Sequence, residues 1–170
     1  MNSVGITYPD INNGIGFRAA LWISGCTHKC PGCHNEWLQD YKIGKPINEF
    51  KKELFDALNK PYISGLTLSG GDPLDQSDND LKQLLELIKE IKTIFPSKTI
   101  WIYSGDTYEN LIKNTTKKEI LSFCDILIDG KFILTKKDLS LPFRGSKNQR
   151  IIDLKTGYEY NSIRLLYRND

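Results

Sequence analysis

The sequence predicts an α/β fold in which parallel strands alternate with helices to form a partial, open βα barrel. Short apolar runs, each closed by a turn that contains glycine, alternate about four times with stretches in which apolar residues recur every three or four positions. A complete eight-fold barrel usually takes about 250 residues and rarely fewer than about 200. The chain has 170 residues, so we expect only part of a barrel, with one side open.

Composition is that of an ordinary globular protein, with 39% hydrophobic and 26% charged residues. A net charge of +2, from 23 basic and 21 acidic side chains, gives no field that would attract nucleic acid or a membrane surface. No apolar run approaches the roughly 20 residues of a membrane span, and residues 1–10 lack the features of a signal peptide. We therefore expect a single cytoplasmic domain, residues 1–170, with no nucleic-acid or membrane partner.

The first third of the chain is expected to hold one strand and one helix. Residues 1–16 are rich in turn formers such as Asn12-Asn13-Gly14 and are predicted to be irregular. Phe17 to Ser24 is predicted to be a strand that leads directly into a cysteine-rich loop. A helix that ends near Pro61 follows, because apolar residues recur at helical spacing. Its apolar side consists of Ile47, Phe50, Leu54 and Leu58.

A second strand and a long helix are expected in the middle of the chain. Ser64 to Ser69 forms the strand, which Gly70-Gly71-Asp72-Pro73 breaks sharply. Ser77, with Asp80 three residues later, has nearly the pattern of a capping box and marks the start of the helix. The apolar face of that helix consists of Leu81, Leu84, Leu85, Ile88, Ile91 and Phe95.

Two more strands are expected beyond this helix. Thr99 to Tyr103 forms the third strand and ends in a turn at Ser104-Gly105-Asp106. Two short helical pieces follow, the second with a capping box that starts at Thr116. Asp125 to Asp129 forms the fourth strand, and Gly130-Lys131-Phe132 comes directly after it.

The last part of the chain is less regular. Phe143 to Arg150 is polar and basic. Ile151 to Tyr160 is predicted to form a hairpin over Lys155-Thr156-Gly157, and Ser162 to Tyr167 a final strand.

Ligands of parallel α/β sheets bind beyond the carboxyl ends of the strands. Four predicted turns occupy that position, namely the cysteine-rich loop, Gly70-Gly71-Asp72, Ser104-Gly105-Asp106 and Asp129-Gly130-Lys131. We expect these four loops to converge on one face of the molecule.

Three of the four cysteines, Cys26, Cys30 and Cys33, lie within eight residues in the pattern C-x3-C-x2-C. In a reducing cytoplasm such thiols are metal ligands or catalysts rather than disulfides. Three thiolates can converge on one metal centre, but a closed zinc site or a fully ligated iron–sulfur cluster takes four ligands. Cys124 stands alone in an apolar stretch and is expected to be a small buried hydrophobe.

Zinc is one alternative for this loop, with His28 or His34 as the fourth ligand. Neither histidine stands at a usual zinc-finger spacing. A zinc knuckle would also not explain the Gly70-Gly71-Asp72 turn.

A four-iron cluster held by three thiolates has one iron without a protein ligand. S-adenosylmethionine can chelate that iron through the amine and carboxylate of its methionine end. An electron from the reduced cluster then breaks the sulfur–C5′ bond and releases methionine and a 5′-deoxyadenosyl radical. Gly70 and Gly71 would let the backbone approach the ligand's amine closely, and Asp72 would attract the ammonium group. Asp72 could instead cap the next helical segment.

The chain resembles the radical S-adenosylmethionine superfamily, in which C-x3-C-x2-C after the first strand is combined with Gly-Gly-Asp-Pro after the second. More narrowly, it is similar to the activating proteins of anaerobic ribonucleoside-triphosphate reductase. The matching residues run from 8 to 150 and are Tyr8-Pro9-Asp10-Ile11, Asn13-Gly14, Gly16, Ser24-Gly25-Cys26, His28, Cys30-Pro31-Gly32-Cys33-His34-Asn35, Leu68-Ser69-Gly70-Gly71-Asp72-Pro73-Leu74, Asp129-Gly130, Phe143-Arg144-Gly145-Ser146 and Asn148-Gln149-Arg150.

The resemblance implies a partial barrel of the radical S-adenosylmethionine type that holds one 4Fe-4S cluster on Cys26, Cys30 and Cys33. It implies an activity in which the adenosyl radical takes hydrogen from a glycine near the C-terminus of the reductase's large subunit and leaves a glycyl radical. An electron donor such as a flavodoxin or ferredoxin is implied as well. We name no general acid or base, because no Ser/His/Asp set or carboxylate pair is evident.

The residues expected to bind the cofactors are Gly32, Cys33, His34, Gly70, Gly71, Asp72, Asp129 and Lys131. Gly32 stands where most of the superfamily carries an aromatic residue, and the His34 ring could pack against the adenine in its place.

Several of these residues have a plainer alternative role. Gly71 could form an ordinary tight turn, His34 could be a surface loop residue, and Asp129 and Lys131 could belong to a solvated loop. Outside this set, Arg144 and Arg150 could dock an acidic or C-terminal part of the partner, or form exposed salt bridges.

Two other functions are compatible with the motifs. One is a radical enzyme of another subgroup, either an activase for a different glycyl radical protein or a small-molecule enzyme such as a deazapurine-type carboxylase. Asn148-Gln149-Arg150 argues against activases that resemble that of pyruvate formate-lyase. The other is a binding module for iron–sulfur or zinc without enzymatic activity.

Overall fold

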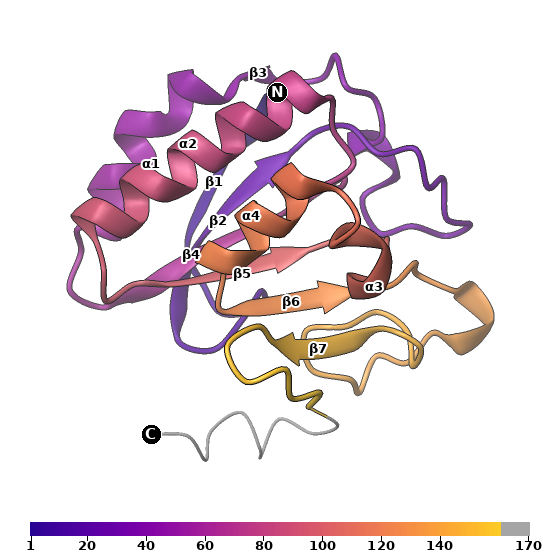
Figure 1. Cartoon of the computed structure of the whole chain (residues 1–170). Coiled ribbons are helices and arrows are strands. Elements are labelled where there is room, and N and C mark those ends of the chain that lie inside the picture. The colour runs from indigo at the N-terminus through magenta and orange to yellow at the C-terminus, as the bar shows by residue number, and fades with distance from the viewer. Residues whose placement is uncertain (161–170) are drawn as a thin grey trace.

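In the described part of the chain, seven strands form a single mixed sheet in the order β3-β1-β2-β4-β5-β6-β7 (Figure 1). The computed structural model describes residues 1–160. The strands are β1 (Asn2–Asp10), β2 (Phe17–Ile23), β3 (Lys45–Pro46), β4 (Ile63–Gly70), β5 (Thr99–Tyr103), β6 (Ile126–Asp129) and β7 (Arg150–Asp153). The helices are α1 (Lys51–Leu58), α2 (Asp78–Ile94), α3 (Tyr108–Leu111) and α4 (Thr115–Phe123), with short 3₁₀ turns η1 (Glu36–Leu38), η2 (Ile47–Phe50) and η3 (Leu134–Lys136).

The four central strands β2, β4, β5 and β6 run parallel to one another. Strand β1 pairs antiparallel with β2, and β7 pairs antiparallel with β6. Within the described residues the two edge strands β3 and β7 do not pair, so the sheet does not close. The prediction of an α/β fold without a closed barrel is confirmed.

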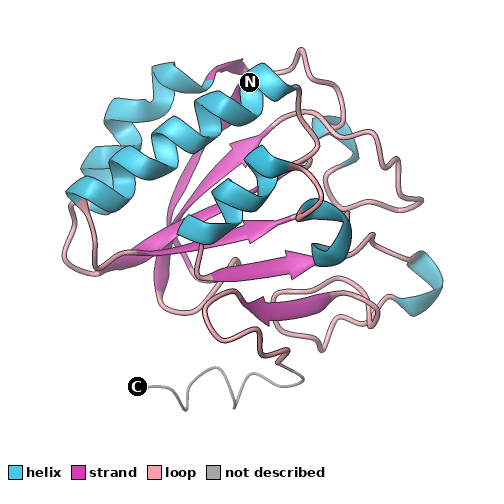
Figure 2. Cartoon of the chain, viewed as in Figure 1, coloured by secondary structure: helices cyan, strands magenta, loops and turns pink. Residues whose placement is uncertain are grey.

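Parallel strands bring the four predicted loops to the same end of the sheet. Figure 2 shows loops gathered at the end toward which the arrowheads of β5 and β6 point. These are the segments that follow β2, β4, β5 and β6. Because each parallel strand delivers its following loop to this edge, residues about 100 positions apart in the sequence become neighbours.

The expectation that residues 1–16 are irregular is wrong for Asn2–Asp10, which form β1. This strand does not show clean alternation, since its pairing with β2 shifts register between Ser3 and Gly5 and again between Thr7 and Asp10. Bulges of this kind hide a strand from sequence patterns because they interrupt the period of two. The turn itself is confined to the residues between β1 and β2.

Helix caps follow the prediction at α2 and depart from it at α4. The Ser77 side chain accepts a hydrogen bond from the Asp80 amide at 3.2 Å, as expected. Helix α4 begins after Asn114, whose side chain accepts from the Lys117 amide at 3.0 Å. Thr116 is therefore already inside the helix, because Asn114 is an equally good cap two residues earlier.

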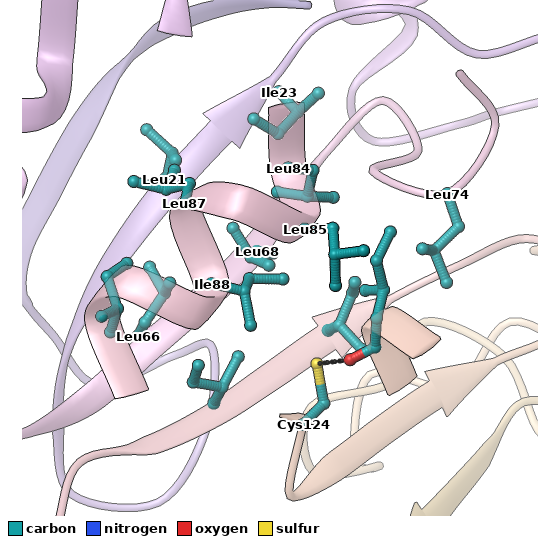
Figure 3. Packing of buried hydrophobic residues seen from close by; sticks show 14 of the residues in the cluster. Leu21, Ile23, Leu66, Leu68, Leu74, Leu84, Leu85, Leu87, Ile88 and Cys124 are labelled. Atoms are coloured by element: carbon teal, nitrogen blue, oxygen red, sulfur yellow. Dashed lines mark hydrogen bonds between the residues drawn. The ribbon is translucent and has the colours of Figure 1, made fainter. Parts of the chain in front are cut away.

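Leucine and isoleucine side chains from the sheet and from α1, α2 and α4 form the main core. Figure 3 shows Leu84 and Ile88 of α2 packed with Leu66 and Leu68 of β4. Cys124 lies in the same core, 2% exposed, and its thiol donates to the Ile120 carbonyl at 3.4 Å. Burial raises the pKa of this thiol, and its predicted role as a small buried hydrophobe is confirmed.

The opposite face of the sheet carries polar side chains at alternate positions. Near its start, β2 places Arg18 there, 1% exposed. The Arg18 guanidinium donates to Thr67 Oγ1 at 2.6 Å and lies 5.3 Å from the centre of the Trp101 ring. Burial lowers its pKa to about 10. Arg18 fills this face near the amino ends of the strands and leaves the carboxyl ends open for a site.

The predicted hairpin at the end of the described chain is confirmed. The Asp153 amide donates to the Tyr158 carbonyl at 2.9 Å, the Tyr160 amide donates to the Ile151 carbonyl at 2.8 Å, and Ile152 bridges Glu159. The predicted strand from 162 to 167 lies outside the described residues. None of the helices in residues 1–160 has the length and apolar character that a membrane crossing requires.

Replacing Ile88 with alanine tests the core. Ile88 is 0% exposed between α2 and the sheet, so Ile88→Ala should lower the free energy of unfolding by about 2–5 kcal/mol through the cavity that it leaves. Urea denaturation followed by circular dichroism measures this change. Glu86→Ala, at an exposed position of the same helix, should change it by less than about 0.5 kcal/mol, and equal losses in both variants would contradict the packing described.

Candidate functional site

A cavity of about 680 Å³ opens at the carboxyl ends of the parallel strands. This volume falls within the roughly 300–1,000 Å³ of small-molecule sites. The predicted site residues that line it are Cys26, Cys30, Gly32, Cys33, His34, Gly70 and Gly71. Asp72, Asp129 and Lys131 are not among its lining residues, although Gly130 is. The structure thus brings the cysteine loop and the two glycines together around one space.

All three clustered cysteines are half-buried, unpaired thiols on the loop that follows β2. Burial raises the pKa of Cys26 to about 11 and also raises that of Cys30. Both thiols are therefore protonated at neutral pH, and a metal that binds them must displace their protons.

The spacing of potential ligands bears on the choice between one metal ion and a cluster. Among the residues that the structure describes, the group whose ligand atoms all lie within 4.8 Å of one another is Cys26, His28 and Asp75. This group leaves out Cys30 and Cys33, so the three thiols do not converge on a single-ion site. Thiols that lie farther apart suit an iron–sulfur cluster, in which each thiolate binds a different iron.

The cysteine loop is held by main-chain hydrogen bonds at its start and within the cysteine motif. The Gly25 amide donates to the Leu38 carbonyl at 2.7 Å, and the Cys33 amide donates to the Cys30 carbonyl at 3.1 Å. Gly32 adopts a φ of 71°, in the left-handed region that favours glycine. A Cβ at this position would lie 3.0 Å from Leu134 Cδ1. A larger residue would press on Leu134, so the backbone conformation and the nearby side chain both favour glycine at this position.

Gly71 joins the loop after β4 to the cysteine loop by direct backbone contact. Its amide donates to the Ile23 carbonyl at 2.8 Å. A Cβ on Gly71 would lie 2.5 Å from the Gly25 carbonyl oxygen and 2.9 Å from that of Leu38. Any side chain here would force the two loops apart, so the close approach of backbones accounts for the glycine.

The Asp72 carboxylate links three of the four loops, although it does not face the cavity. It is 1% exposed, and one of its oxygens, Oδ2, contacts groups of the cysteine loop and of the loop after β5. These contacts are His28 Nε2 at 3.0 Å, Ser104 Oγ at 2.9 Å and the Gly105 amide at 2.8 Å. The other oxygen, Oδ1, accepts from the Leu74 amide at 2.8 Å, so it caps the turn that follows and not a helix.

The contact with Asp72 also changes the titration of His28. The hydrogen bond to the carboxylate raises the pKa of His28 above its ordinary value, against the opposing effect of burial. The imidazole ring also fills space beside the loop after β5, since a Cβ on Gly105 would lie 2.4 Å from the His28 ring. Both contacts fix the middle of the cysteine loop.

Asp129 is buried and bound to protein groups. Its carboxylate accepts from Arg150 Nε at 2.9 Å and from the Tyr108 amide at 2.7 Å. Arg150 also makes two hydrogen bonds to Glu109, at 3.0 and 2.8 Å, and this pairing lowers the pKa of Glu109 to about 2. Of the two roles considered for Arg150, its contacts are those of a salt-bridging residue. Lys131 is exposed on the other side of Gly130.

Arg144 lines the cavity and has spare hydrogen-bonding capacity. One terminal nitrogen donates to the Gln149 carbonyl at 3.1 Å, but Nε is buried without a hydrogen-bond partner among the described residues. Burial lowers the pKa of this guanidinium. Arg144 therefore brings positive charge to the wall of the cavity.

Sequence reasoning missed the strand residues that line the cavity. Trp22, Ser69 and Tyr103 face it from β2, β4 and β5. Side chains alternate along a strand, so counting back from the loop glycines to the residues on the polar face would have found them.

Comparisons with known proteins agree with this geometry. Residues 12–152 match the family described as a 4Fe-4S single cluster domain. The anaerobic ribonucleoside-triphosphate reductase-activating protein of Pasteurella multocida (strain Pm70) is 42% identical over 154 residues, which cover 89% of this chain and 96% of the relative. The protein of the same name from Escherichia coli (strain K12) is 37% identical, with coverages of 87% and 96%, and that of Enterobacteria phage T4 is 39% identical, with coverages of 85% and 89%. The family match and the three thiols together support an iron–sulfur cluster.

Single cysteine replacements test which thiols bind iron. Cys26→Ala, Cys30→Ala and Cys33→Ala should each lose most of the iron and the visible absorbance after anaerobic reconstitution, because each removes one ligand. Cys124→Ala is the matched control, since Cys124 is buried in the core, and it should retain both. If Cys30→Ala and Cys33→Ala load as much iron as the unaltered chain while Cys26→Ala does not, the single-ion group with His28 and Asp75 would be the metal site.

Replacing Asp72 by asparagine tests the contact that joins the loops. Asparagine has only one acceptor oxygen. It cannot accept from the Leu74 amide on one side and from Ser104 and the Gly105 amide on the other, so Asp72→Asn should destabilise the metal-free chain by about 1–3 kcal/mol. Urea unfolding gives the value. Asp56→Asn, at an exposed position of α1, should have a much smaller effect, and a similar effect of the two replacements would argue against this role of Asp72.

Proposed function

Since the chain belongs to the family of anaerobic ribonucleoside-triphosphate reductase-activating proteins, we propose that it generates a glycyl radical on the large subunit of that reductase. The observation that carries the proposal is that the C-x3-C-x2-C thiols and the Gly70-Gly71 turn line the same cavity. A zinc or iron–sulfur module without activity has no need of this shared space beside three thiols.

We assign a 4Fe-4S cluster to Cys26, Cys30 and Cys33 and S-adenosylmethionine to the rest of the cavity. When both are bound, the cluster supplies the electron that splits S-adenosylmethionine into methionine and a 5′-deoxyadenosyl radical, which takes hydrogen from a glycine α-carbon. The one-electron donor is proposed to be a flavodoxin or ferredoxin. The open sheet is then a partial barrel of the radical S-adenosylmethionine type, built as one domain over residues 1–170.

In this proposal the backbone and side chains of the loops position the ligands and keep water out. Gly70 and Gly71 offer closely approaching backbone to the amine of S-adenosylmethionine, while Gly32 and the exposed His34 border the cavity near the thiols. The buried Asp72 carboxylate does not contact the ligands and instead holds together the loops that line the cavity.

The region after β6 completes the proposed site. Asp129 and Lys131 belong to it as the residues that flank Gly130, which lines the cavity. Arg144 also lines the cavity, and its guanidinium would attract a carboxylate bound there.

Exposed apolar side chains near the cavity support a protein as the substrate. Leu139 lines the cavity and is 87% exposed, and Leu134, which packs beside Gly32, is 51% exposed. Apolar groups that remain exposed beside a binding site favour contact with a protein partner. A loop of the reductase that carries the target glycine is such a partner.

The decisive assay uses the chain reconstituted anaerobically with iron and sulfide. With dithionite and S-adenosylmethionine it should release 5′-deoxyadenosine and methionine, and with the reductase added it should give the electron paramagnetic resonance doublet of a glycyl radical. The Cys30→Ala variant should do neither, because it lacks one cluster ligand.

Two failures are distinguishable in this assay. If a reconstituted chain releases no 5′-deoxyadenosine, the radical chemistry is wrong. If cleavage occurs but no radical forms on the reductase, only the assigned partner is wrong.

A further inference from the structure

Three consecutive side chains bind three consecutive residues of the segment that leaves β6. The side chains belong to Asn148-Gln149-Arg150, and the residues that they bind are Asp129-Gly130-Lys131. The contacts join Arg150 Nε to Asp129 Oδ1 at 2.9 Å, Gln149 Nε2 to the Gly130 carbonyl at 3.0 Å and Asn148 Nδ2 to the Lys131 carbonyl at 2.8 Å. Each donor meets one acceptor, in antiparallel order.

These contacts continue the sheet beyond the point where its main-chain pairing ends. Asp129 opposite Arg150 is the last pair of the β6–β7 ladder. Gly130 has a φ of 97° and leaves the strand direction, so main-chain pairing stops there. The amide groups of Gln149 and Asn148 then supply the hydrogen bonds that a longer strand would have supplied.

Gln149 uses both ends of its amide group. While Nε2 donates to Gly130, Oε1 accepts from the Gly145 amide at 2.8 Å and from the Ser146 amide at 3.1 Å. The oxygen therefore shapes the turn over residues 145–149, and the nitrogen attaches that turn to Gly130. We refer to Asn148 and Gln149 together as the clamp.

The segment that the clamp holds, residues 130–134, forms one wall of the cavity beside the cysteine loop. Phe132 lines the cavity, and the Ile133 amide donates to Ser146 Oγ at 3.2 Å. On its other side the segment reaches the cysteine loop, where Leu134 packs at Gly32. At the centre of the segment, the Phe132 backbone amide is hydrogen-bonded to the Cys30 thiol.

We infer that Asn148 and Gln149 are positioning residues for the metal centre, because they hold residues 130–134 against the cysteine loop and so restrict access to it. The inference rests on the cluster assigned under the proposed function. Asn148 and Gln149 thus bind residues of their own chain, as the neighbouring Arg150 does through its salt bridges. Partners that hold the surroundings of metal ligands in place typically change metal affinity by about 10–100-fold when they are removed.

The chain offers a matched set of variants for the test. Gln149→Glu keeps the oxygen that shapes the turn and removes the donor to Gly130, whereas Asn148→Ala removes the donor to Lys131. The control is Lys147→Ala, because Lys147 lies in the same turn with a side chain that is 68% exposed and outside the clamp.

The first measurement is the rate at which an iron chelator removes the reconstituted cluster, followed by the loss of visible absorbance. We expect removal to be about tenfold faster in Gln149→Glu and in Asn148→Ala, and unchanged in Lys147→Ala. Chelation rates in both clamp variants equal to that of the control would overturn the inference.

The second measurement needs no cluster and separates positioning from general destabilisation. Hydrogen exchange of the metal-free chain should be about tenfold faster at the Phe132 amide in the clamp variants and unchanged at Leu68 in the centre of the sheet. Equal acceleration at both amides would show a merely structural role and overturn the inference. If the unaltered chain binds no cluster, the proposed function fails, and the assignment of the clamp to a metal centre fails with it.

Discussion

The buried carboxylate of Asp72 is the contact on which the arrangement of the site depends. Removing a carboxylate from water is costly unless hydrogen bonds replace its hydration. Asp72 receives them from the cysteine loop, from its own turn and from the loop after β5. Because one charged group needs all these donors, separating the loops would expose the carboxylate to water or leave it without hydrogen-bond donors. The three thiols therefore keep a fixed position relative to the strands.

Because side chains alternate along each strand, one face of the sheet packs in the core and the other face lines the cavity. In β4, Leu66 and Leu68 pack under the helices, while Thr67 and Ser69 face the opposite side. Arg18 and Trp101 fill the start of that polar side, and the cavity opens where the parallel strands end. Asp72 fixes one side of this space and the clamp fixes the other, which leaves the cavity mouth as the side open to a partner.

Much of this could be predicted from local patterns. The helical period of Leu84 and Ile88 located α2, and the glycine turns located the ends of the parallel strands, so the convergence of the thiols with Gly71 followed from topology. Bulges hid β1, and Asn114 competed with Thr116 as a cap. The partners of Asp72 and of Gln149 lie far away in the sequence, and no local pattern records which distant donor or acceptor a side chain will meet.

In the proposed reaction, hydrogen passes from a glycine of the reductase to the 5′-deoxyadenosyl group. Reductase made with glycine deuterated at its α-carbon measures this directly when it is combined with the reconstituted chain, S-adenosylmethionine and a reductant. We expect 5′-deoxyadenosine that carries one deuterium, together with a glycyl radical on the reductase. A glycyl radical accompanied by 5′-deoxyadenosine without deuterium would contradict it.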